Sequence, residues 1–175
     1  KGMTERAIDY YKQAFDLCDA LYKDCKTTEA ACDLSLICES LGNIYTQKND
    51  NSLAIVYCKR ELELRKILTK SIKTAAALDD LACAYVKTAM LKHPFDTEML
   101  IQAYSIYCSL CDAYPDVMKY RKDKETMNQK LAELYQEENY NPAKGCLPMI
   151  IQMIVIMALF AVLRNPMTYI SNEEM

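Results

Sequence analysis

The stretch Leu41-Gly42-Asn43-Ile44-Tyr45 has the form Leu-small-x-x-Tyr, and this form occurs twice more in the chain. The other two copies are Leu81-Ala82-Cys83-Ala84-Tyr85 and Leu131-Ala132-Glu133-Leu134-Tyr135. A small residue lets two helix backbones approach closely, and a Tyr three residues later fills the groove beside that contact. Three copies therefore indicate an internal repeat of helices that pack in pairs.

The composition also indicates long helices with few turns. Of the 175 residues, 3 are Gly and 5 are Pro, whereas sandwiches, barrels and α/β folds need many of these turn-forming residues. Hydrophobic residues make up 51% of the chain, which permits a sizeable core and argues against disorder. We expect an all-α protein, and its net charge of −3 is too weak to steer it by itself toward nucleic acid or any strongly charged partner.

Seven helices are predicted from apolar residues that recur every three or four positions and from the polar residues and prolines that separate them. They span about 3–22, 28–46, 52–68, 71–92, 97–114, 116–138 and 148–163. Because the connections are short, successive helices are expected to be antiparallel neighbours in a right-handed superhelical stack.

The residues around the first tetrad resemble the tetratricopeptide repeat, a family of stacked helix hairpins. The matching residues are Leu41, Gly42, Tyr45, Ala54, Ala103, Tyr107 and Pro115. The resemblance covers about residues 4–138, although the tetrads are 40 and 50 residues apart instead of about 34. It implies a right-handed antiparallel helix-hairpin solenoid that is similar to this family.

The resemblance also implies that a peptide or protein segment binds in a concave groove without catalysis and without a cofactor. The groove candidates, carried over by position, are Glu39, Asn43, Asp79, Asp80, Lys130 and Glu133. Most of them are acidic, which favours a basic partner through charge complementarity. The alternative is that they are ordinary solvated residues on exposed helix faces.

Residues that carry chemistry are sparse in this sequence. There is one His, and neither a phosphate-binding loop nor a Ser-His-acid pattern is present. Cys108 and Cys111 share a helix face, but a structural zinc site needs four ligands, so we expect packing cysteines and no metal. The nine cysteines do not form the pattern of a small disulfide scaffold and suit free thiols in the cytoplasm. A non-enzymatic, cytoplasmic protein is predicted.

Residues 146–163 form a C-terminal stretch without any charged residue, between Lys144 and Arg164. A helix that begins at Pro148 has about 16 residues, close to the lower limit of about 17 for a membrane span. Such a helix is apolar on all sides, which implies burial on all sides. We expect burial within the chain, or a homodimer through residues 147–163, in preference to a membrane anchor.

The predicted organisation is a repeat domain over residues 1–144, an apolar helix over 145–164 and a polar tail over 165–175. The favoured function is a protein-interaction scaffold. Two alternatives stay open: a peptide-sensing regulatory domain of a larger protein, and a tail-anchored membrane assembly factor.

Overall fold

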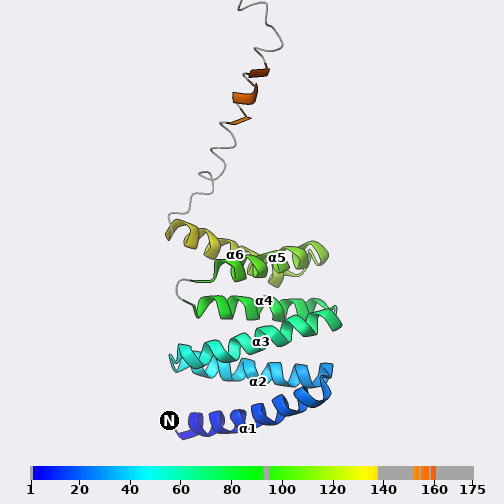
Figure 1. Ribbon diagram of the computed structural model, residues 1–175, viewed down its shortest axis with the longest axis vertical. Coiled ribbons are helices and arrows are strands. Elements are labelled where there is room, and N and C mark those ends of the chain that lie inside the picture. The colour runs from blue at the N-terminus through cyan, green and yellow to red at the C-terminus, as the bar shows by residue number, and fades with distance from the viewer. Residues whose placement is uncertain (1, 93–94, 138–151, 154, 158, 161–175) are drawn as a thin grey trace, which may run out of the picture. The chain divides into compact units, whose positions relative to one another are not determined.

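A computed structural model describes residues 2–92, 95–137, 152–153, 155–157 and 159–160 (Figure 1). Six α-helices lie within residues 2–137, the described residues between 152 and 160 are also helical, and none of the described residues forms a strand. The helices are α1 (Gly2–Cys25), α2 (Thr28–Gln47), α3 (Asn51–Ser71), α4 (Ala75–Met90), α5 (Thr97–Ala113) and α6 (Met118–Glu137). The all-α prediction is confirmed. The chain divides into two units, Lys1–Ala132 and Glu133–Met175.

Short polar side chains begin four of these helices. The side chains of Thr27, Asp50, Thr74 and Asp96 each accept a hydrogen bond, 3.1–3.3 Å long, from the backbone N–H three residues further on. Each cap contributes about 1 kcal/mol. The cap at Thr74 moves the start of α4 from the predicted residue 71, and Ser71 is instead the last residue of α3.

Helices that follow one another in the sequence pack against one another within the first unit. Contacts join α1 to α2, α2 to α3, α3 to α4 and α4 to α5, and these helices lie one above the next in Figure 1. Helices α1–α5 are called the helical stack below. Each helix must bury an apolar stripe, and neighbours in sequence are the first partners available to it.

The first tetrad lies at a close contact between α2 and α3. A Cβ atom added to Gly42 would lie 2.8 Å from Sγ of Cys58, so a larger residue there would require the Cys58 side chain to shift. Tyr45 is 4% exposed and stacks on Tyr57, with ring centroids 5.6 Å apart. Phe15 of α1 meets the edge of Tyr57 at 5.5 Å. The tetrad therefore packs three helices together.

Candidate functional site

Five charged side chains meet where α2, α3 and α4 pack together. Lys87 of α4 donates hydrogen bonds to Glu61 of α3 at 3.0 Å and to Glu39 of α2 at 3.1 Å. Arg65 of α3 donates to Asp80 of α4 at 2.7 Å and to Glu39 at 3.3 Å. Glu61 and Arg65 are 1% and 7% exposed. The ion pairs that Glu61 and Arg65 form with their neighbours offset the cost of removing these two charges from water.

Burial and the neighbouring charges together shift the pKa values of Glu61 and Lys87 in this network. It raises the pKa of Glu61, and the attraction of Lys87 offsets only part of that effect. Burial acts to lower the pKa of Lys87, but Glu61 and Glu39 outweigh it, so the pKa is raised and the ammonium stays charged. Oε2 of Glu61 and Nε of Arg65 have no hydrogen-bond partner among the described atoms. The network therefore stabilises the stack less than its number of ion pairs suggests.

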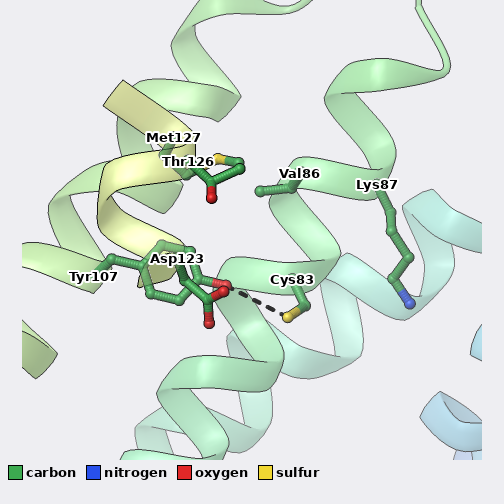
Figure 2. Close-up of a pocket in the computed structure, with 7 residues that line it drawn as sticks. All are labelled: Cys83, Val86, Lys87, Tyr107, Asp123, Thr126 and Met127. Atoms are coloured by element: carbon green, nitrogen blue, oxygen red, sulfur yellow. Dashed lines mark hydrogen bonds between the residues drawn. The ribbon is translucent and has the colours of Figure 1, made fainter. Parts of the chain in front are cut away.

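A cleft of about 240 Å³ lies beside this network, between α4, α5 and α6 (Figure 2). It is lined by Cys83, Val86, Lys87, Tyr107, Asp123, Thr126 and Met127. Sγ of Cys83 lies 3.5 Å from the hydroxyl of Tyr107, and Asp123 lies beside the same ring (Figure 2). The Lys87 ammonium points away from that ring and toward Glu61. The cleft has largely apolar walls and one carboxylate at its edge.

Burial perturbs the titratable groups of this cleft. It raises the pKa of Asp123, against the opposing attraction of Lys119. It also raises the pKa of Cys83, which the hydrogen bond with Tyr107 lowers in part, and it raises the pKa of the Tyr107 hydroxyl. Asp123 forms no ion pair within the part of the chain that the structure describes. A cation placed in this cleft would stabilise the ionised carboxylate of Asp123.

A second cleft, of about 360 Å³, also has Lys87 in its lining. It is lined by Asn43, Thr46, Asn49, Asn51, Lys87, Met90 and Leu91. Amide side chains both donate and accept hydrogen bonds, which suits a polypeptide backbone. The lining residues of the two clefts that belong to α2, α4 and α6 are together called the α2–α4–α6 face.

The structure places the predicted groove residues in different settings. Asn43 lines the second cleft, while Glu39 and Asp80 share Arg65. Asp79 is paired with Lys119, and Lys130 donates to Sδ of Met90 at 3.2 Å. Glu133 is exposed and belongs to the second unit. Glu39, Asp79 and Asp80 are therefore partly neutralised within the chain.

Helix α6 is attached to the helices before it by several contacts. The pair between Lys119 and Asp79 joins it to α4. The ring of Tyr120 meets Tyr114, just after α5, at a centroid distance of 6.2 Å. Met127 of α6 is 5% exposed. The beginning of α6 is thus held on the helical stack.

The sequence interpretation missed Glu61, Arg65 and Lys87 as members of one site. Glu61 and Arg65 lie on the buried side of α3, at positions where the surrounding spacing predicts apolar residues. Charged residues inside an apolar stripe were therefore the available signal. Cys108 and Cys111 are half-buried free thiols. Among the described residues, no group of His, Cys, Asp or Glu is placed to hold a metal.

The described residues of the predicted C-terminal helix are helical and carry exposed apolar side chains. Met153, Ile156 and Phe160 are 60%, 57% and 68% exposed. Within the described ranges, no helix has the length and apolarity to cross a membrane. The remainder of the predicted helix and the predicted polar tail, residues 165–175, lie outside the described residues.

Comparison with known families matches the C-terminal third of the chain. The sequence model of the family described as 60Kd inner membrane protein matches residues 117–174. The match begins one residue before α6 and includes the apolar stretch 146–163. These residues are called the insertase-like segment below, because the relatives that the chain matches carry the name insertase.

Three such relatives are bacterial proteins named "Membrane protein insertase YidC". The chain is 49% identical to that of Fusobacterium nucleatum over 47 residues, which is 27% of this chain and 23% of the relative. It is 46% identical to that of Caldanaerobacter subterraneus over 47 residues, with the same shares. It is 51% identical to that of Thioalkalivibrio sulfidiphilus over 45 residues, 26% of this chain and 8% of the relative. The chain thus spans less than a quarter of these relatives, and no solved structure matches it.

These comparisons overturn the assignment to the tetratricopeptide repeat family, for which they give no support. The third tetrad, Leu131 to Tyr135, lies inside the segment that matches another family. The three tetrads therefore do not establish an array of tetratricopeptide repeats. The physical reason for the error is that a small residue followed by Tyr reports close helix packing, as at Gly42, and such packing is common to many helical folds.

The predicted cytoplasmic location is also wrong. The matching family is described as an inner membrane protein, and the relatives are named membrane protein insertases. The prediction relied on the cysteine pattern, which reports the redox state of the thiols and does not report attachment to a membrane. Of the functions considered from the sequence, the membrane assembly factor agrees best with these relatives.

Proposed function

We propose that this protein is a non-enzymatic, membrane-associated factor that assists the assembly of membrane proteins. The observation that carries the proposal is the match of residues 117–174 to the 60Kd inner membrane protein family. Relatives named membrane protein insertase share 46–51% of their residues with this chain over the aligned parts. The insertase-like segment is proposed to supply the contact with the membrane and with the protein being inserted.

The character of residues 146–163 supports association with a membrane. Eighteen consecutive uncharged residues, flanked by Lys144 and Arg164, are close to the about 20 that cross a bilayer. Ile156 and Phe160 are more than half exposed in the second unit. Large apolar surfaces are unfavourable in water, and a bilayer removes that cost. A homodimer through residues 147–163 is the alternative use of this surface.

The helical stack together with α6 is proposed to be the part that receives a protein segment. We propose that α1–α6 form a right-handed helix-hairpin solenoid, so that α2, α4 and α6 share one side of it. On this proposal the segment lies on the α2–α4–α6 face. Asn43 would contact its backbone, and Asp123 would attract a basic side chain. Glu39, Asp79, Asp80, Lys130 and Glu133 would orient it less strongly where their charges are shared with neighbours.

Flotation with lipid vesicles tests the membrane part of the proposal. The full chain is expected to float with vesicles made of bacterial phospholipids. Ile156→Asp places a charge in the apolar stretch and is expected to lower the partition about 100-fold, because a carboxylate within a bilayer costs about 3 kcal/mol. Val56→Asp is the matched control, because Val56 and Ile156 are both 57% exposed. Flotation that both variants retain equally would contradict the proposal.

A further inference from the structure

One side of α1 carries apolar side chains that are largely exposed to solvent. Tyr10, Leu17 and Leu21 are 71%, 73% and 50% exposed, and Ala14 lies between them. The intervals from Tyr10 to Ala14, Leu17 and Leu21 are four, three and four residues. This alternation is the spacing of a coiled-coil seam. These four residues, called the α1 stripe below, form a continuous surface on a helix of 24 residues.

The opposite side of α1 is fixed to the helical stack. Ile8 is 4% exposed in the core. Asp19 pairs with Arg60 of α3 at 2.8 Å, and Glu5 pairs with Lys48, just after α2, at 2.7 Å. These contacts lie along the length of the helix. Because they hold α1 in one rotation about its axis, the α1 stripe stays turned outward.

We propose that the α1 stripe binds the α1 stripe of a second copy of this chain in antiparallel orientation, which forms a homodimer. In the register that places Tyr10 opposite the partner's Leu21, Leu17 lies opposite the partner's Ala14. Each layer then joins a larger side chain to a smaller one, as interdigitated packing requires. Two-fold symmetry repeats every one of these contacts.

Charged residues at the two ends of the α1 stripe favour a second copy of the chain as the partner, in antiparallel orientation. Arg6 and Asp24 lie along the same edge of the stripe, by helical spacing, and neither forms an ion pair with a described residue. In the antiparallel register Ala7 lies opposite the partner's Asp24, so Arg6 comes beside that carboxylate. In a parallel pair, two-fold symmetry would place Arg6 of one copy and Asp24 of the other on opposite edges and 18 residues apart along the helices, so this contact could not form. The chain thus supplies both halves of a self-complementary surface.

Analytical ultracentrifugation of the full chain in a non-ionic detergent, over a series of protein concentrations, tests this proposal. The full chain is expected to form a dimer. Leu17→Arg is expected to raise the dimer Kd by on the order of 100-fold, because each copy loses a central contact. Val56→Arg, which alters an exposed apolar residue of α3, is expected to leave the Kd unchanged. Circular dichroism is expected to show the same helix content in both variants.

A charge exchange gives an independent readout of the antiparallel register. Arg6→Asp and Asp24→Arg are each expected to weaken the dimer several-fold, and the double variant is expected to regain most of the affinity. A chain that stays monomeric at every concentration would overturn the proposal, and the α1 stripe would then be a binding surface for a different polypeptide. A Leu17→Arg variant that stays dimeric would also overturn it and assign association to another surface, such as residues 147–163. Failure of the double variant to recover affinity would rule out the register.

Discussion

Lys119 of α6 forms an ion pair with Asp79 of α4. Asp79 is 9% exposed, and its Oδ1 atom has no hydrogen-bond partner among the described atoms. Lys119 therefore provides most of the interaction that offsets the cost of burying the Asp79 carboxylate. The insertase-like segment begins at residue 117, immediately before α6. The pair therefore ties the beginning of that segment to the helical stack.

Replacing Lys119 by Met is expected to destabilise the protein. The change leaves the Asp79 carboxylate buried without a partner, but Lys119 is itself more than half exposed, so we expect a loss of about 1 kcal/mol. Lys122→Met removes a charge from an exposed position on the same helix and is expected to have almost no effect. Urea unfolding followed by circular dichroism measures both. Equal stability of the two variants would show that the pair contributes nothing.

The network around Glu61 is expected to make stability depend on pH. The pKa of Glu61 is raised in the folded state above its ordinary value of 4.5, so the folded chain holds this proton more tightly than the unfolded chain. As the pH rises through 4.5 and then through the raised pKa, the wild type loses free energy of unfolding relative to Glu61→Gln. The difference between the two proteins, measured by urea unfolding from pH 4 to pH 8, is expected to shift in favour of the wild type as the pH falls.

Glu63→Gln is the control for this titration, because Glu63 lies on the same helix with a side chain that is 66% exposed. Its loss is expected to change the free energy of unfolding by less than about 0.5 kcal/mol, because an exposed ion pair such as that of Glu63 with Arg60 contributes little. A difference between wild type and Glu61→Gln that stays constant across the pH range would contradict the assigned role of burial.

Gly42 is expected to resist substitution because of its contact with Cys58. The methyl group of Gly42→Ala would lie 2.8 Å from Sγ, and such overpacking costs about 1–3 kcal/mol. Adding Cys58→Ala removes the sulfur and is expected to recover most of that loss, as a double-mutant cycle. Gly2→Ala, with nothing within 4 Å, is expected to be harmless. Additive effects of the two changes would mean that the contact is not close.

Cys83 is expected to react slowly with alkylating reagents although its residue is exposed. Burial of the thiol raises its pKa, and the hydrogen bond with Tyr107 opposes that rise. Tyr107→Phe removes the opposing effect and is expected to slow alkylation of Cys83 several-fold at pH 8, because the thiolate is the nucleophile. Mass spectrometry of labelled peptides gives the rate. Tyr104→Phe, on the same helix, is the control, and an unchanged or faster rate in Tyr107→Phe would refute the assignment.

The sequence was sufficient to predict the helices and their order. Apolar residues at intervals of three and four, with caps such as Thr27 and Asp96, placed six helices within a few residues of their observed ends. The start of α4 was misplaced, because Ser71 and Thr74 are both good cap residues and only the packing of α3 decides between them.

The site was harder to predict, because its members come from separate helices. Glu39, Glu61 and Lys87 are far apart in the sequence, and only the packing of α2, α3 and α4 brings them together. Spacing along one helix cannot report such a contact. The family assignment failed for a related reason. The tetrad at Leu131 has the same residue pattern as the first two, but the sequence around it resembles a different family.

The most direct test of the proposed function is an insertion assay with the full chain reconstituted in lipid vesicles. A newly synthesised membrane protein with a single span is added, and the fraction protected from protease is measured against empty vesicles. We predict a protected fraction several-fold above that of empty vesicles, retained in Val56→Asp and lost in Ile156→Asp. A protected fraction equal to that of empty vesicles, for a chain that floats with the same vesicles, would contradict a role in membrane protein assembly.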